Sequence, residues 1–192
     1  MTFNDRSDPL ALILTRRSAK PREMVAPGPD AGELDTILQA AARVPDHGKL
    51  APWRFVVVPQ DKRERLGEVL VAALAAEKPD AGALEIEAVR GFAHQAPVLV
   101  VVLSSPRKVP IPVWEQELSA GAACMQLLNA AHALGYVGGW LTTWAAFSPA
   151  VLAAFGTPEE RIAGFMFLGS PGKPLDERPR PEMAAVVSRW NG

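Results

Sequence analysis

Residues 97–103 read Pro97-Val-Leu-Val-Val-Val-Leu103, a run of apolar side chains that no polar residue interrupts. Its length and its valines predict a β-strand. Because apolar side chains point to both faces of such a strand, both faces are expected to be covered. The run therefore predicts the central strand of a sheet that has helices packed on it.

Helical and strand patterns fill the chain on both sides of this run. One helix begins with a capping box formed by Asp30 and Glu33, and residues 18–29, with three prolines, are expected to be extended. The order of elements predicts one α+β domain over residues 1–192, with a mixed central sheet flanked by helices. We expect further strands at 53–58, about 138–142 and 162–168, and helices at 9–17, 30–43, 61–77, 80–93, 118–134, 148–155 and 182–188.

The helix expected at 118–134 is the longest, and it is apolar almost all round. A helix of this kind belongs to the core or to a subunit interface. The residues that follow the last strand, about 171–192, carry prolines at 171, 174, 179 and 181 and cannot build a core of their own. We expect them to form an arm that packs on a neighbouring surface, for which a partner subunit is the obvious candidate.

The composition is that of an ordinary globular protein. The 192 residues, 48% of them hydrophobic and 21% charged, suffice to bury a core within one domain. A net charge of −1 argues against a general nucleic-acid binder, which carries a broad basic surface. The single cysteine, Cys124, fits a reducing compartment, and neither a signal-type segment in residues 1–9 nor a bilayer-spanning stretch is evident. We therefore expect a cytoplasmic protein.

Several catalytic chemistries lack the residues that they need. His47, His94 and His132 are far apart and none stands in a pair with ligand spacing, so no metal site is expected. Cys124 lies among apolar helix residues, where a thiol acts as a small apolar side chain rather than a nucleophile. Gly-x-Ser-x-Gly, P-loop and dinucleotide-binding motifs are missing from the sequence, which disfavours hydrolases and Rossmann dehydrogenases. No side chain is nominated as a general acid or base.

Three segments carry residues suited to ligand binding. Residues 16–18, Arg-Arg-Ser, make a compact anion site, because guanidinium groups fork onto phosphate oxygens; a solvated basic helix end is the alternative. Residues 43–49 crowd cations, a histidine and a carboxylate into a turn, or they form a capped turn exposed to water. Gly138 and Gly139 permit close approach of a flat ligand, or they form a tight turn beside the packed indole of Trp140.

Six fragments, specific in their order and spacing, run along nearly the whole chain. They are Arg16-Arg17-Ser18, Arg43-x-Pro-Asp-His47 leading to Ala51-Pro-Trp53, Pro112-x-Trp114-Glu115-Gln116-Glu117-x-Ser119-Ala120-Gly121, Gly135-x-x-Gly138-x-Trp140, Gly164-Phe165-x-x-Leu168-Gly169-x-Pro171 and Arg178-Pro-Arg180-Pro. Together they resemble the nitroreductase family of flavin enzymes, specifically its small single-domain bacterial members.

The resemblance implies a nitroreductase-like fold and an intertwined, FMN-dependent homodimer with the flavins at the subunit interface. Leu141 stands where related sequences often have an arginine, so a backbone contact is implied there. The implied cofactor contacts are Arg16, Arg17 and Ser18 at the phosphate and ribityl chain, Arg43 and His47 reaching the flavin from the partner subunit, Trp140, Leu141 and Thr142 along the ring, and Arg180 at the phosphate, with Arg178 as the alternative.

The implied activity is that of an NAD(P)H oxidoreductase that passes hydride, by a ping-pong mechanism, to a nitroaromatic, a quinone or a similar acceptor. Two alternatives stay open: a non-catalytic flavin-binding dimer that acts as a sensor or carrier, and a different flavin reaction on the same fold. The choice between NADH and NADPH is also open, because no ribose-reading element is recognisable. Trp53 and residues 61–93 are candidates for the wall of the acceptor pocket, although packing at a strand end is the favoured alternative for Trp53.

Overall fold

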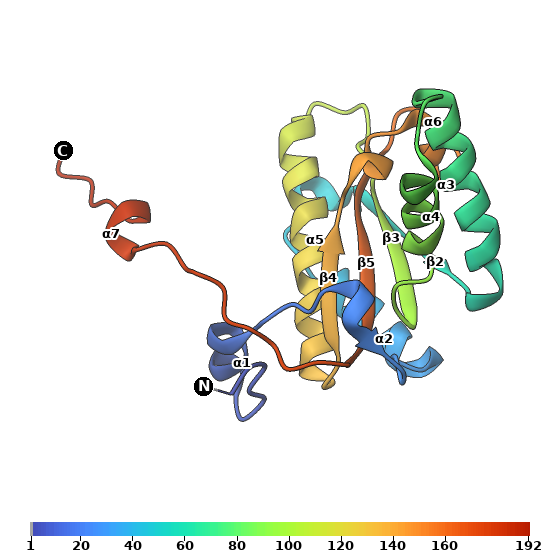
Figure 1. Ribbon diagram of the computed structural model, residues 1–192. Helices are drawn as coiled ribbons and strands as arrows, with labels where there is room; N and C mark the ends of the chain where they lie inside the picture. The colour runs from blue at the N-terminus through green and yellow to red at the C-terminus, as the bar shows by residue number, and fades with distance from the viewer. Residues whose placement is uncertain (1) are drawn as a thin grey trace.

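The computed structural model describes residues 2–192 and has a sheet covered by helices on both faces (Figure 1). In Figure 1, α5 stands on one side of the sheet and α3 and α4 stand on the other. The helices are α1 (Pro9–Thr15), α2 (Ala31–Ala41), α3 (Arg63–Glu77), α4 (Ala83–Phe92), α5 (Val113–Ala133), α6 (Pro149–Leu152) and α7 (Met183–Val186), and the strands are β1 (Met24–Val25), β2 (Trp53–Val58), β3 (Val98–Ser104), β4 (Val137–Leu141) and β5 (Arg161–Pro171).

The strands lie in the order β2, β3, β5, β4, and β1 pairs with the last residues of β5. Every one of these pairings is antiparallel, so the expectation of a mixed sheet is wrong. The helical pair α3 and α4 returns the chain to the end of the sheet that it left, and β3 therefore runs back beside β2. β3 and β4 do share a direction, but β5 lies between them and opposes both.

Two apolar cores lie on opposite faces of β3 and β5. Leu99 and Val101 of β3 face α3 and α4, whereas Val100 and Val102 face α2 and α5. All four of these side chains are fully buried. This burial on both faces confirms that the apolar run is a central strand of an α+β fold.

Local sequence signals explain most of the element boundaries. The capping box is present: the Asp30 carboxylate accepts the N–H of Glu33 at 2.9 Å, and the Glu33 carboxylate accepts the N–H of Asp30 at 3.0 Å. The long helix begins at Val113, five residues before its expected start, directly after Pro112. The expected extended connection at residues 18–29 is interrupted by a 3₁₀ turn at Pro21–Glu23, after which Met24 and Val25 form strand β1.

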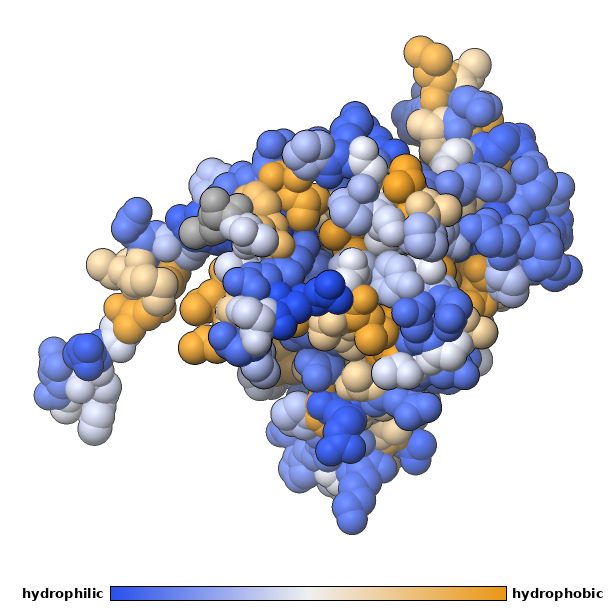
Figure 2. Space-filling model, turned by 90° about the horizontal axis from the view of Figure 1, so that it is seen from below, coloured by the Kyte–Doolittle hydropathy of each residue, from blue (hydrophilic) through white to orange (hydrophobic). Residues whose placement is uncertain are grey.

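The C-terminal residues leave the body of the protein. From residue 176 onward every residue is exposed, and the chain runs away from the sheet to α7 (Figure 1). Figure 2 shows apolar side chains on this arm, well apart from the rest of the surface; Met183, Val186 and Val187 are more than half exposed. That the arm packs on a partner subunit stays a prediction. No helix in residues 2–192 combines the length and the apolar character that a membrane crossing requires.

Candidate functional site

The arginine pair lies in a segment that runs along the edge of β4. Helix α1 ends at Thr15, and the chain continues in extended form, with the N–H of Ala19 donating to the carbonyl of Gly138 at 3.2 Å. A Cβ atom on Gly139 would lie 2.9 Å from the carbonyl oxygen of Ala19. The absence of a side chain at Gly139 therefore lets residues 16–20 lie directly on the strand.

This segment, the end of β4 and the C-terminal arm enclose a hollow of about 320 Å³. We call it the cationic hollow. It brings together residues that are more than 120 positions apart in sequence, including most of the predicted cofactor contacts. Its lining residues are Arg16, Arg17, Ser18, Ala19, Lys20, Pro21, Met125, Leu128, Gly139, Trp140, Leu141, Arg178 and Arg180.

Positive charge in the cationic hollow is only partly balanced. Lys20 is 3.5 Å from Glu23 and Arg180 is 3.4 Å from Glu177, but no carboxylate of residues 2–192 is within 4.0 Å of a nitrogen of Arg16 or Arg17. The pKa of Arg16 lies below its ordinary value because the guanidinium is partly buried and because Arg180 and Arg17 repel its charge. An anion bound here would relieve this repulsion, which is the property expected of a phosphate site.

Arg16 and Arg17 contact different parts of the protein. Arg16 Nη1 donates to the hydroxyl of Ser18 at 3.1 Å, so the predicted Arg-Arg-Ser group is connected. Arg17 instead turns toward the arm, where its Nε donates to the carbonyl of Asp176 at 2.5 Å. Arg180 Nη2 approaches the carbonyl of Arg16 at 3.4 Å. The arm of the same chain therefore completes the cationic hollow, and both Arg178 and Arg180 line it.

Two residues that support Arg17 were not expected from the sequence. The side-chain oxygen of Asn4 accepts the N–H of Arg17 at 2.8 Å, and the amide of Asn4 donates to the carbonyl of Arg17 at 3.3 Å. His132, fully buried in α5, lies with Nε2 3.2 Å from the same carbonyl. Its Nδ1 faces a second carbonyl, that of Leu128, and burial lowers the pKa of the ring against the raising effect of these two carbonyls. Nothing in the sequence signals either of these two contacts.

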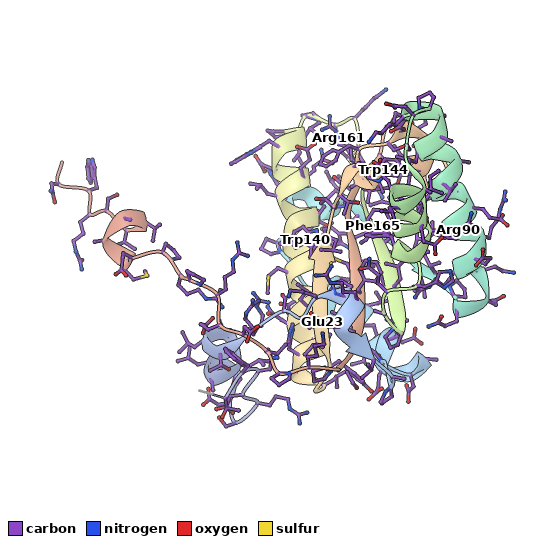
Figure 3. All side chains as sticks on the ribbon, in the orientation of Figure 1. Glu23, Arg90, Trp140, Trp144, Arg161 and Phe165 are labelled. Atoms are coloured by element: carbon purple, nitrogen blue, oxygen red, sulfur yellow. The ribbon has the colours of Figure 1, made fainter. Side chains whose placement is uncertain are left out.

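Trp140 forms a flat wall of the cationic hollow. Its indole N–H donates to the carbonyl of Ala163 at 2.9 Å, and the ring lies against Gly164, where a Cβ atom would collide with it. The side chain is 38% exposed, and Figure 3 shows it at the edge of the sheet beside α5. The exposed ring surface is suited to stacking against a planar ligand.

The glycines before Trp140 have a different role from the one expected. A Cβ atom on Gly138 would lie 2.5 Å from the side chain of Leu128, and Gly139 is covered by residues 19–21. Protein atoms therefore fill the space beside both glycines, and the close approach that they permit is to α5 and to the arginine segment.

Three of the predicted contact residues lie outside the cationic hollow. Thr142 is exposed just beyond its rim, and Arg43 is exposed after the end of α2. His47 lies in a separate turn, with Nδ1 2.8 Å from the Glu115 carboxylate of α5. Within the part of the chain that the structure describes, neither Arg43 nor His47 lines the hollow.

Other candidate groups have structural explanations. Burial raises the pKa of the Cys124 thiol to about 12, which leaves it unreactive. Trp53 packs against Ala120 and Ala123 of α5 as a core side chain. Among residues 2–192, no three His, Cys, Asp or Glu side chains gather as a metal site would require.

A larger hollow, of about 520 Å³, lies between α6 and the start of β5. Its lining is largely apolar, and the buried carboxylate at its wall, Glu160, is already paired with Arg54 at 2.8 Å. It lacks the cluster of unbalanced cations that marks the cationic hollow.

The sequence matches one family model over most of its length and is similar to named bacterial proteins. The model of the Nitroreductase family matches residues 13–170. The chain is 38% identical over 167 residues to the Escherichia coli K12 protein named "Putative NAD(P)H nitroreductase YdjA", covering 85% of this chain and 88% of that protein.

Two solved structures share the fold. The nitroreductase-like family protein from Bacillus cereus superposes with a TM-score of 0.84 at 18% identity, over 97% of each chain. The nitroreductase from Bacteroides fragilis, solved with bound FMN, superposes with a TM-score of 0.69 at 24% identity, over 96% of this chain and 100% of that one.

Proposed function

Because the chain belongs to the nitroreductase family, we propose that it is an FMN-dependent NAD(P)H oxidoreductase. The observation that carries the proposal is the cationic hollow, in which unbalanced guanidinium groups lie beside an exposed indole. FMN presents a dianionic phosphate at one end and a flat ring at the other, and these two features require the same two surfaces. The FMN bound to the Bacteroides fragilis structure supports the choice of cofactor.

The residues of the cationic hollow divide between the two ends of the cofactor. Arg16, Ser18 and the arm arginines would hold the phosphate, since they supply charged and hydroxyl donors on three sides. Arg17 would keep the arm in place through Asp176 while adding positive charge. Trp140 and Leu141 would lie along the ring, with Thr142 at its far edge. The bound flavin would supply the hydride chemistry, and these residues would bind and orient it.

We further propose that the active form is a homodimer. Arg43 and His47 lie outside the cationic hollow of their own chain. In the proposed dimer they would reach the cofactor of the partner subunit. Exposed apolar side chains that such an interface would bury are present on α1, on α5 and on the arm: Leu10, Ile13, Leu14, Val113, Trp114, Leu118, Met183, Val186, Val187 and Trp190.

The reduced nicotinamide and the electron acceptor would use the same exposed ring surface in turn. Such sharing predicts ping-pong kinetics, in which each substrate binds only after the other has left. Nitroaromatics and quinones are the acceptor classes to assay. The protein contributes binding and electrostatic stabilisation, and no side chain is assigned as acid or base.

The proposal is tested by cofactor content and bleaching. The purified protein is expected to bind FMN and to lose its flavin absorbance with excess NADH or NADPH under anaerobic conditions. The double variant Arg16→Ala/Arg17→Ala should stay folded and hold little FMN, because it removes anion donors and no core side chain. The control Lys62→Ala/Arg65→Ala removes the same charge from exposed positions far along the chain and should keep full occupancy.

Full FMN occupancy in the arginine double variant would contradict the phosphate site. A flavoprotein that binds FMN but never bleaches with either nicotinamide would instead indicate a sensor or carrier.

A further inference from the structure

The turn that carries His47 is held in an uncommon conformation. Gly48, Lys49 and Ala51 have φ angles of +76°, +55° and +47°, all in the left-handed region. For Lys49 and Ala51, which have side chains, this conformation costs free energy and persists only where the surroundings impose it. Contacts from outside the turn must therefore impose its shape.

Asp46 and helix α5 restrain the turn. The Asp46 carboxylate accepts the N–H groups of Leu50 at 3.0 Å and Ala51 at 2.8 Å. From α5, the Ser119 hydroxyl donates to the carbonyl of Pro45 at 2.5 Å, and Glu115 Oε2 lies 2.8 Å from His47 Nδ1.

Glu115 and Ser119 are four residues apart and so share one face of the helix. Helix α5 thus holds the turn by its backbone, at the Pro45 carbonyl, and by the imidazole ring of His47. On the turn's other side, Ile111 packs against Gly48, where a Cβ atom would lie 2.4 Å from its side chain.

The contact with Glu115 determines which ring nitrogen of His47 carries hydrogen. An ionised carboxylate only accepts hydrogen bonds, so Nδ1 must be the donor. In a neutral ring the other nitrogen, Nε2, then has a free lone pair. The His47 side chain is 66% exposed, and no hydrogen bond within residues 2–192 reaches Nε2. The turn therefore presents a hydrogen-bond acceptor of fixed identity to whatever covers this surface.

We propose that Glu115 is a positioning residue, which fixes the His47 tautomer so that Nε2 accepts a hydrogen bond from the cofactor held by the partner subunit. This inference rests on the proposed function. The donor that a flavin offers along its pyrimidine edge is the ring N3–H, and the adjacent oxygens are acceptors. Against this edge of the ring, a tautomer with Nε2 unprotonated would select N3–H and the opposite tautomer a carbonyl oxygen, whereas ribityl hydroxyls, which both donate and accept, would not discriminate between the two tautomers.

The tautomer itself is tested without any cofactor. Histidine labelled with ¹⁵N is observed by NMR in alkaline buffer, where histidine rings are neutral, and His47 is assigned by comparison with a His47→Ala sample. We expect Nδ1 protonated and Nε2 unprotonated. In Glu115→Gln, whose amide can either donate or accept, we expect a mixture of tautomers or the opposite one. A wild-type ring protonated at Nε2 would overturn the proposal.

The consequence for binding is tested with FMN and with 3-methyl-FMN, which lacks the N3–H donor. The wild type should bind FMN about tenfold more tightly than the analogue, a ratio typical of one hydrogen bond. Both Glu115→Gln and His47→Ala should lower this ratio toward one, and the double variant should be no worse than His47→Ala alone. Glu87→Gln, an exposed carboxylate on α4, is the matched control and should behave as wild type.

Glutamine preserves the size of the side chain and its ability to form a hydrogen bond. If Glu115 only supports the turn sterically, Glu115→Gln will bind both flavins as the wild type does, and the proposal is then overturned. If the wild type binds neither flavin, the proposed function fails, and the NMR result still decides whether Glu115 fixes the tautomer.

Discussion

Among single residues, Gly139 has a direct effect on the cationic hollow. Its missing side chain lets the carbonyl of Ala19 and the ring of Pro21 lie against β4, and this contact sets the path of the arginine segment. Gly91, in the last turn of α4, provides a contrast, because nothing lies within 4 Å of the position that a Cβ atom would take.

We expect Gly139→Ala to displace residues 16–20. The change should lower the free energy of unfolding by roughly 1–3 kcal/mol, as overpacking does, and should weaken FMN binding. Gly91→Ala should raise stability by at most about 1 kcal/mol, since alanine is the better helix former, and should leave FMN binding unchanged. Urea unfolding and flavin titration of both variants provide the comparison. FMN affinity in Gly139→Ala equal to that of the wild type would show that the path of the segment is unimportant.

Glu160 makes the protein sensitive to acid. Hydrogen bonds from Arg54, foremost, and from Ser105 and the N–H of Thr157 lower its pKa from 4.5 to about 2, against the opposing effect of burial. Because the folded-state pKa is depressed, the stabilisation is complete above about pH 4.5 and is lost as the pH falls toward 2.

The loss attributable to Glu160 should amount to roughly 3 kcal/mol at most. Glu160→Gln should therefore be less stable than the wild type at pH 7, and the difference should shrink at pH 3. Urea unfolding at the two pH values measures this. A difference that does not change with pH would contradict the role given to the Glu160 carboxylate.

At the scale of elements, the strands and the first helices followed closely from local sequence. The apolar run at 97–103 and the capping box at Asp30 each determine one element through its own residues, and both were predicted correctly. The antiparallel sheet was not predicted, because the position of β5 between β3 and β4 depends on long-range pairing that no local pattern records.

In the candidate site too, local motifs could be predicted from the sequence and long-range contacts could not. The Arg16-Arg17-Ser18 group was visible as a motif, and the structure brings Trp140, Leu141 and Arg180 to it. The support from Asn4 and His132 was not visible, because an asparagine near the N-terminus and a histidine in a helix carry no signal of their contact with Arg17.

The arm contributes arginines to the cationic hollow and, in the proposal, apolar side chains to the partner. Residues 177–192 are all exposed and none belongs to either core, so a chain that ends at Asp176 should fold. We expect this truncated chain to bind FMN at least tenfold more weakly, because Arg178 and Arg180 are lost. Circular dichroism checks that the truncated chain folds, and flavin titration measures its affinity for FMN. Unchanged FMN affinity would place the phosphate away from the arm.

For the whole molecule, the exposed apolar surface of α5 predicts association. Leu118 is 54% exposed on this helix, and Leu84, which is 90% exposed on α4, lies on the opposite side of the sheet. Leu118→Glu should weaken the dimer, because it buries a charge in the proposed interface. Leu84→Glu should leave the dimer intact. Sedimentation velocity over a range of concentrations distinguishes the two variants. A wild-type protein that is monomeric at all concentrations would contradict a cofactor site formed by two subunits.

In the proposed function, guanidinium groups of the cationic hollow bind the phosphate of FMN. The most direct measurement compares the dissociation constants of FMN and riboflavin, which differ only in that phosphate, by fluorescence titration of the apoprotein. We expect FMN to bind at least 100-fold more tightly, the effect of about two charge-assisted hydrogen bonds. Equal affinity for FMN and riboflavin would show that these guanidinium groups do not bind the phosphate.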